Sequence, residues 1–379
     1  MKIDTTLNPL PVLTWNWLRM NKANFLEEAE LKKSLATFEA EQLPRGVQWE
    51  QAQSGANENG KLTENGGDQN GKLTENGAPK KITGALGANF DKMILQNAAR
   101  STLTISAGAK FDAPIIVRLN LKDGEAAFNE LFIDAGEDSE VTVIITFDSA
   151  KSAGGLNAAR TTIRAAQNAR IKAATIQTLG KGFVHLNDIA TIGGENSLVE
   201  IEQLELGAQK IFFGAYSTLS EPLSQFKHNA AYFMDGEREL DMNFVALQTG
   251  AKTQSDMNVY GTLNDSAKKT YRGTIDFRRG CAGAIGDEQE ETLLLSPDVV
   301  NKSIPLILCD EEDVQGEHGA TIGRLDESVL FYMNSRGISL EEAQKMMARA
   351  KIARVAAFVG GEEEAQKALD FFDSAFGDE

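Results

Sequence analysis

The feature that most constrains this chain is a long stretch, from about Ile82 to Leu308, in which apolar and polar side chains alternate. Such period-two alternation is typical of β-strands with one buried face. The clearest runs are Ile115–Leu121, Val141–Phe147, Thr161–Ile176, Val199–Leu206, Met242–Leu247 and Tyr271–Phe277. Because helical patterns are nearly absent between them, doubly wound folds and (β/α)-barrels are excluded. A sandwich, a propeller and a β-helix remain.

Short turns separate these runs and favour one of the three folds. The runs starting at Val141, Ile171 and Val199 begin 30 and 28 residues apart, although a further start near Leu240 breaks the rhythm. The turns between them are rich in Gly, Asn, Asp and Ser, and small residues occur within the strands. Repeated strand and turn units of this kind stack into a solenoid with one continuous core. The periodicity therefore favours a mainly β chain built as a parallel β-helix over residues 81–323.

The first 80 residues have a different pattern. Over Asn21–Gln42, apolar residues recur at three-to-four spacing among Glu and Lys, which predicts an N-terminal helical segment within residues 1–50. Residues 51–80 are rich in Gly, Asn, Glu and Gln, and NGKLTENG occurs there twice. Such a stretch buries too little surface to offset its ordering entropy, so we expect a flexible linker.

The same linker contains two matches to the G-x-x-x-x-G-K frame of a phosphate-binding loop, at residues 55–61 and 66–72. Each is followed by leucine, at Leu62 and Leu73, where a Ser or Thr must reach the magnesium ion. Neither follows an apolar strand or opens a helix. We interpret both as chance matches in a glycine-rich tract, so the chain is not expected to be an ATPase.

After Gly323 the apolar period changes to about 3.6, which predicts a small helical domain over residues 324–379. Asp326 is expected to cap a first helix, Ser339 and Glu342 to form a capping box on a second, and Glu362 to begin a third. One side of the second helix carries Met346, Met347 and other apolar residues. Such a stripe is either core or a surface that docks a partner, and both alternatives stay open.

The net charge of the chain limits which classes of partner it can bind. Acidic residues number 55 against 38 basic ones, a net charge of −17, which repels nucleic acid and anionic lipid. No apolar run approaches the ~18 residues of a membrane span. The opening residues lack the layout of a signal peptide, and Cys281 and Cys309 are the two cysteines. We therefore expect a cytoplasmic protein with neither a nucleic-acid nor a membrane partner.

His318 is the strongest candidate for chemistry. It lies among carboxylates, next to Glu317 and nine residues after Cys309. Imidazole, carboxylate and thiolate are ligands of borderline-soft metals, although no established metal-binding spacing is present and acidic loops are usually only solvated. His185 and His228 lack such a neighbourhood and are predicted to be surface or strand-end residues.

Several segments resemble the SufB and SufD family of iron-sulfur cluster assembly proteins. The segments are LLLSP, DVQGEHGATIGRLDE, LFYMNSRGIS and EEAQKMMARA within Thr292–Arg349, and the opening LPVLTWNWLRMN is similar to the N-terminus of shorter SufD members. The resemblance implies a right-handed parallel β-helix flanked by helical regions. It also implies that His318 matches a family histidine near the SufB/SufD junction. Many relatives have cysteine two positions before it, whereas this chain has Gly316.

The resemblance further implies partners. SufD pairs with SufB through the β-helix, and the C-terminal helices of each bind one copy of the ATPase SufC, so that the complex builds a nascent cluster. We expect a non-catalytic scaffold without a cofactor of its own. Whether the chain alone forms a homodimer is left open. His318 and Glu317 are the expected assembly residues, with His318 as a metal ligand. The expected SufC contacts are Leu330, Phe331, Arg336, Met346 and Met347.

Two alternatives remain. A SufB-like subunit holds the cluster itself and usually has a cysteine where this chain has Glu290, so the SufD side of the family is favoured. A β-helix carbohydrate-active enzyme would use its groove for an extended polysaccharide. Such enzymes are usually exported, which the expected lack of a signal peptide disfavours.

Overall fold

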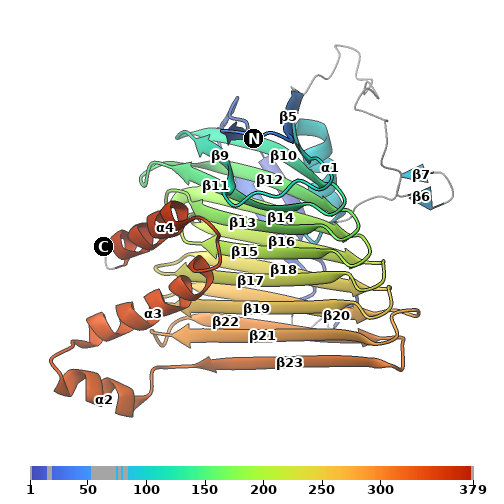
Figure 1. Cartoon of the computed structure of the whole chain (residues 1–379). Coiled ribbons are helices and arrows are strands. Elements are labelled where there is room, and N and C mark those ends of the chain that lie inside the picture. Colours follow the sequence, from blue (N-terminus) through green and yellow to red (C-terminus); the bar gives the residue numbers. More distant parts are fainter. Residues whose placement is uncertain (1, 15–18, 53–73, 76–77, 80–83, 377–379) are drawn as a thin grey trace.

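The computed structural model describes residues 2–14, 19–52, 74–75, 78–79 and 84–376. Strands make up 53% of it, and most of them form a parallel β-solenoid of about 8 turns (Figure 1). The β-helix predicted from the alternation is therefore confirmed. The boundaries of the predicted domains, at residues 50, 80 and 323, stay predictions. No helix in the described residues is long and apolar enough to cross a bilayer.

The solenoid consists of two sheets that face each other. The first, which we call the arm-side sheet, has the order β22-β20-β18-β16-β14-β12-β10-β8-β5, with β3 pairing beside β10. Its strands are β3 (Lys32–Lys33), β5 (Val47–Ala52), β8 (Ala99–Ile105), β10 (Glu125–Ala135), β12 (Gly154–Ala165), β14 (Gly182–Gly193), β16 (Lys210–Leu219), β18 (Glu239–Gln248), β20 (Lys268–Phe277) and β22 (Val300–Cys309).

The second, the helix-side sheet, has the order β23-β21-β19-β17-β15-β13-β11-β9-β4. Its strands are β4 (Glu39–Glu41), β9 (Ile115–Leu121), β11 (Glu140–Ser149), β13 (Arg170–Thr178), β15 (Leu198–Glu205), β17 (Gln225–Met234), β19 (Gln254–Leu263), β21 (Ala284–Leu294) and β23 (Val314–Gly323). Consecutive long strands alternate between the two sheets, so each turn of the solenoid adds one strand to each.

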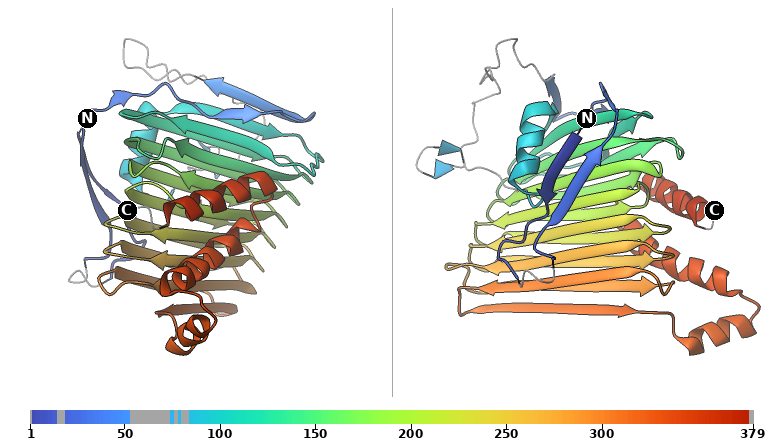
Figure 2. Two further views of the ribbon diagram at one scale, coloured as in Figure 1. Left: turned by 90° about the vertical axis from the view of Figure 1, so that its left-hand side faces the viewer. Right: turned by 180° about the vertical axis from the view of Figure 1, so that it is seen from behind.

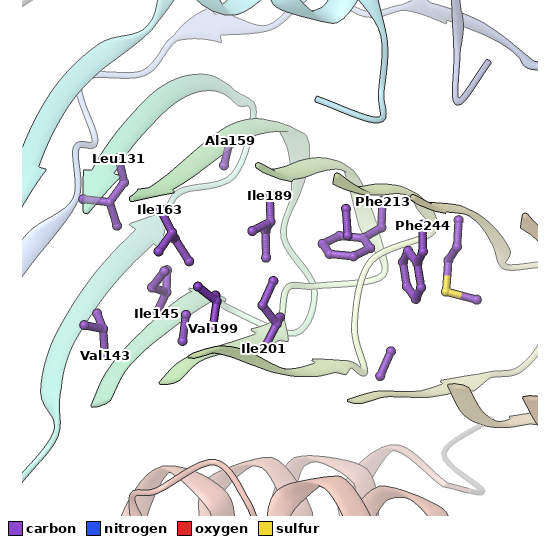
Figure 3. Close-up of a cluster of buried hydrophobic side chains, with 14 of the residues drawn as sticks. Leu131, Val143, Ile145, Ala159, Ile163, Ile189, Val199, Ile201, Phe213 and Phe244 are labelled. Atoms are coloured by element: carbon purple, nitrogen blue, oxygen red, sulfur yellow. The ribbon is translucent and has the colours of Figure 1, made fainter. Parts of the chain in front are cut away.

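The register explains the rhythm in the sequence. Val141 stacks on Ile171, Ile171 on Val199 and Val199 on Phe226. The apparent break near Leu240 was a misinterpretation, because Leu240 belongs to the opposite sheet, where it stacks on Ile211. Side chains stacked in this way fill the space between the sheets (Figure 3). The alternation thus records which side chains enter one continuous core.

The helix predicted over Asn21–Gln42 is wrong. That stretch contains β2 (Ala23–Glu28), β3 and β4, and β2 pairs antiparallel with β1 (Lys2–Leu7). Phe25 packs edge-on against Phe212 of the arm-side sheet, while Phe38 enters the core beside Phe147. These contacts and the backbone hydrogen bonds offered by the sheet edges outweigh a helix propensity that is always a weak preference.

The short N-terminal helix lies elsewhere, at α1 (Ala88–Asn97). Together β1, β2 and α1 form an N-terminal arm across the outer face of the arm-side sheet (Figure 2, right). Buried polar contacts fasten it there: the Asn8 side-chain amide donates to Asp241 Oδ1 at 2.6 Å, and Arg272 donates to the Met20 carbonyl at 2.7 Å. Arg272 also pairs with Asp241 at 2.6 Å.

The predicted linker over residues 51–80 lies almost entirely outside the described residues, and so do both G-x-x-x-x-G-K matches. Within it the structure describes only the end of β5 and the small pair β6 (Thr74–Glu75) and β7 (Ala78–Pro79).

Three helices follow β23, as the sequence predicted: α2 (Glu327–Ser335), α3 (Leu340–Ala356) and α4 (Glu362–Ala375). Asp326 caps α2, and Ser339 with Glu342 forms the predicted capping box on α3. Helices α3 and α4 pack on the outer face of the helix-side sheet through Ile352, Phe372 and their neighbours (Figure 2, left). None of the residues of α2 is buried.

Candidate functional site at the open end of the β-helix

The two ends of the solenoid differ. At the N-terminal end, which we call the completed end, the short edge strands β4 and β5 run antiparallel to β9 and β8, and Phe38 is fully buried in the core beside them. At the other end, β22 and β23 are the last strands of their sheets, and the described residues place nothing beyond them (Figure 1). Most of β23 is exposed, whereas every second residue of β21 is buried. An uncovered pair of strand edges is a template for another chain.

His318 lies on the inward face of this open end. It stacks in register on Glu288, whose side chain is buried between the sheets. His318 itself is exposed because no further turn covers it. Glu317 stacks on Asp287 and so belongs to the outward face of the same strand. The two predicted assembly residues therefore point to opposite sides of β23.

Beneath His318 the core changes from apolar to polar. We call this set, contributed by β20 and β21, the lumen cluster: Lys269, Tyr271, Glu288, Glu290 and Thr292. Lys269 forms an ion pair with Glu290. Thr292 donates to Glu290 Oε1 at 2.9 Å. The cluster is nearly shielded from solvent, with each side chain at most 3% exposed.

Neighbouring residues make room for these polar side chains. A Cβ on Gly273 would lie 2.0 Å from Glu288 Oε1, so glycine leaves the space that this carboxylate fills. In the same way, Gly261 leaves space for the ring of Tyr232, whose hydroxyl reaches Thr292 at 3.1 Å. The small residues seen in the sequence thus serve interior polar groups as well as the close stacking of turns.

Burial controls the protonation of the lumen cluster. It raises the pKa of Glu288 to about 7, with repulsion from Glu290 adding to the rise. Burial also lowers the pKa of Lys269, against the opposing attraction of Glu290, and raises the pKa of Tyr271 well above its usual value. Near neutral pH, the open end can therefore hold or release a proton at Glu288, directly below an exposed imidazole.

The rim of the open end is partly apolar. Ile307 and Ile322 lie on the inward faces of β22 and β23 and are 37% and 44% exposed. Cys309 is also exposed, and its thiol donates to the Glu311 carbonyl at 3.0 Å. A Cβ on Gly316 would come within 2.9 Å of the Phe277 ring, so a cysteine at this position would require that ring to shift.

In the described part of the chain, no three His, Cys, Asp or Glu side chains come together as a metal site. The inward face of β23 thus contributes a single imidazole, and a metal bound there would need ligands that the described residues do not bring together with it. The expectation that His318 ligates metal stays a prediction.

The residues predicted to contact the ATPase lie on α2 and α3. Phe331 is 76% exposed and Met346 54% exposed; Met347 and Arg336 are also exposed, while Leu330 is half-buried. The Arg336 guanidinium lies 5.2 Å from the centre of the Tyr332 ring. Because α2 follows β23 directly, this exposed apolar surface begins beside the open end (Figure 1).

The prediction for the other two histidines was wrong. His185 and His228 are fully buried between the sheets, where burial lowers the pKa of each to about 3. His228 lies among aromatic rings, and the centre of its ring is 4.2 Å from the centre of the Phe244 ring. Its Nε2 is 3.1 Å from Gln203 Oε1. The signal was present in the sequence: each histidine shares the phase of the apolar residues in its strand.

The fold and the site together define a class of protein: a two-sheeted parallel β-helix with one open, polar-lined end and with helices packed along one face. The family model described as "SUF system FeS cluster assembly, SufBD core domain" matches residues 117–351, more than half of the chain. The chain therefore belongs to the SufB/SufD family, and the resemblance found in its sequence is confirmed.

Individual relatives are distant. The chain is 24% identical over 263 residues to the iron-sulfur cluster assembly protein SufD of Bacillus subtilis, covering 67% of this chain and 59% of the relative. It is 27% identical over 227 residues to SufD of Escherichia coli, covering 59% and 53%. A SufBD family protein of Staphylococcus saprophyticus is 24% identical over 250 residues, covering 65% and 54%. The chain thus spans little more than half the length of these relatives.

Proposed function

We propose that this chain is a non-catalytic, SufD-like scaffold subunit. In this proposal its open end pairs with a SufB-like subunit, and its C-terminal helices bind a SufC-like ATPase. The single observation that carries the proposal is an asymmetry in how the core ends: Phe38 is fully buried at β4 and β5, whereas the inward-facing Ile307 and Ile322 are 37% and 44% exposed at β22 and β23. Unpaired edges with an apolar rim are features that another chain would cover.

His318 is proposed to face the cluster that the complex builds, which is cargo and not a resident cofactor. An exposed imidazole on an inward face can donate one ligand or one proton, and a SufB-like partner would supply the remaining groups. Glu317 points outward, so we assign it to the interface and not to the cluster. In the absence of the partner, two copies of the chain could cover each other's open ends as a homodimer.

A SufB-like, cluster-holding role is the second candidate. The lumen cluster, a buried polar set beneath the open end, is the feature that favours it, whereas Glu290 stands where such a subunit usually has a cysteine. Its ion pair with Lys269 already occupies that carboxylate, so we prefer the scaffold role. The family match also favours assembly over a carbohydrate-active enzyme.

The pairing is tested by copurification with a SufB-like and a SufC-like protein. Ile307→Asp with Ile322→Asp places charge on the rim and should abolish recovery of the SufB-like subunit. Leu35→Asp, an equally apolar and 91% exposed site far from the rim, is the matched control. Undiminished recovery with the rim variant would refute the assignment of the open end.

The ATPase surface is tested separately. Phe331→Asp with Met346→Asp should remove the SufC-like protein while leaving the SufB-like subunit bound, because both side chains are exposed and off the rim. His318→Ala should leave both partners bound and lose cluster formation, followed by visible absorbance under anaerobic conditions. Full cluster formation by His318→Ala would exclude the proposed role of this residue.

A further inference from the structure

The loop that joins β1 to β2 presents exposed apolar side chains outside the site described above. The structure describes residues 8–14 and 19–22 of this loop, which we call the arm loop. Leu13 is 73% exposed and Val12 48% exposed. Figure 2 (right) shows the β1–β2 hairpin lying along the arm-side sheet, with the arm loop at the end nearer the open end. The proposed function assigns no role to these residues.

Side chains of the arm-side sheet fix the arm loop in place. The Asn243 side-chain amide of β18 donates to the Pro9 carbonyl at 3.1 Å, and Arg272 of β20 donates to the Met20 carbonyl at 2.7 Å. Asn243 and Arg272 are each 1% exposed. Buried donors of this kind are left without these acceptors when the loop lifts away, so the loop is held firmly at both ends.

The arm loop also ties its own two ends together. The Leu10 amide donates to the Asn21 carbonyl at 2.8 Å, and the Thr14 amide donates to Asn21 Oδ1 at 2.7 Å. Val12 and Leu13 lie between these two attachment points and are therefore presented from a fixed base. A fixed base lowers the ordering entropy that a partner has to offset when it covers exposed side chains.

The strand next to the arm loop is apolar on its outer face. Arg272 stacks in register on Ile304 of β22, the last strand of the arm-side sheet, so the base of the loop lies one strand from the edge. On the outer face of β22, Ile304, Leu306 and Leu308 are half-buried and apolar, whereas Arg272 and Asp276 occupy the same face of β20. An apolar surface thus continues from the rim of the open end around β22 toward the arm loop.

The position of the arm loop indicates which partner can reach it. The N-terminal arm packs on the outer face of one sheet, and α3 with α4 packs on the outer face of the other (Figure 2). A protein bound at the C-terminal helices is therefore on the opposite side of the solenoid. A protein that covers the edge of β22 lies beside the arm loop, so the loop is continuous with the contact proposed for the SufB-like subunit.

We infer that the arm loop is a second contact for the subunit that covers the open end. Val12 and Leu13, together with the outer face of β22, pack against an apolar surface of the SufB-like subunit. This inference rests on the proposed function, which assigns that subunit to the open end. It gives the N-terminal arm a role in binding as well as in covering its sheet.

Titration calorimetry of the full chain with the SufB-like subunit measures this contact. Val12→Asp with Leu13→Asp should raise the dissociation constant at least roughly tenfold, because charge replaces two apolar side chains in the contact. Leu26→Asp with Leu35→Asp changes two leucines that are 55% and 91% exposed outside the loop and should leave the constant unchanged. Recovery of the SufC-like protein by each variant verifies that the chain is folded.

A photoreactive residue identifies the occupant directly. When the complete complex is irradiated, p-benzoylphenylalanine in place of Leu13 should crosslink to the SufB-like subunit. The inference is overturned if the loop variant binds as tightly as the parent, or if position 13 crosslinks to the SufC-like protein or to a second copy of the chain and not to the SufB-like subunit.

The same measurements separate this inference from the proposed function. If the rim variant loses the SufB-like subunit while the loop variant keeps it, the inference fails and the proposed function stands. If the parent chain does not bind that subunit, both fail.

Discussion

At the scale of single residues, buried polar groups set how this protein responds to pH. His185 and His228 stay neutral between the sheets, since burial lowers the pKa of each to about 3. Glu205 and Glu288 behave in the opposite way, with pKa values that burial raises to about 8 and about 7. Falling pH therefore weakens the native state through the histidines, and rising pH weakens it through the carboxyls, between the usual carboxyl pKa of 4.5 and about 8.

His228→Phe tests the acid side. Below pH 6.5 this histidine binds a proton in the unfolded chain, whereas in the folded chain it binds one only near pH 3. The free energy of unfolding thus falls by up to about 1.4 kcal/mol for each pH unit per buried histidine. In urea denaturation, the free energy of unfolding of the variant should fall less steeply than that of the parent between pH 6.5 and 5. Phe213→Leu changes the core without removing a titrating group. It should lower the free energy of unfolding at every pH and leave its dependence on pH unchanged.

Glu288→Gln tests the alkaline side. The folded protein keeps a proton on Glu288 that the unfolded chain releases above its usual value of 4.5, so stability is lost as pH rises through 7. As pH rises from 5 to 8.5, the free energy of unfolding of the variant should therefore increase by roughly 3 kcal/mol relative to that of the parent. Asp287→Asn removes an acidic group from the outward face of the same strand and is the matched control. A constant difference across this pH range would contradict burial as the cause.

At the scale of elements, one corner of the solenoid repeats the same left-handed backbone. Asp138, Asn168 and Asn196 have φ between 54° and 57°, and their side chains form a ladder: Asn196 donates to Asn168 at 2.9 Å and Asn168 to Asp138 at 3.0 Å. Leu223 continues the stack with φ of 62°. Leucine in this conformation is strained and ends the ladder.

Leu223→Asn should therefore stabilise the protein by about 1 kcal/mol, because asparagine tolerates this conformation and can donate to Asn196. Leu223 is 44% exposed, so little burial is lost. Chemical denaturation measures the change. Leu35→Asn, at an exposed site without positive φ, should have almost no effect. A destabilised Leu223→Asn protein would show that the leucine contacts matter more than the strain.

The same scale shows what the sequence could predict. Strand alternation in Ile115–Leu121 and the capping box at Ser339 were correct, because each depends on neighbours along the chain. The helix over Asn21–Gln42 was wrong because distant partners, Phe212 and Phe147, decide that segment. The two sheets could not be separated by spacing alone, which is why Leu240 seemed to break a rhythm that it does not share.

The site was predicted only in part. The acidic neighbourhood of His318 singled it out and the family resemblance supported it, but its inward direction and the outward direction of Glu317 depend on the register with β21. The lumen cluster was missed because Lys269, Glu288 and Glu290 alternate with other polar residues, so their strands lack the apolar stripe that marks a core. Only stacking between turns identifies them as interior.

At the scale of the whole molecule, the protein is a rod with one completed end and one open end. The N-terminal arm packs on one sheet and α3 with α4 packs on the other, whereas the last turn of the solenoid and the adjoining α2 are largely exposed. This division leaves two neighbouring surfaces for two partners. It is the physical basis for the scaffold role proposed for this member of the family.

The most direct test is amide hydrogen exchange of the chain alone and in complex with a SufB-like subunit. The account predicts that exchange in β22 and β23 slows at least about tenfold on binding, while β4 and β5 at the completed end are unchanged. A complex that forms without any slowing in β22 and β23 would contradict the account.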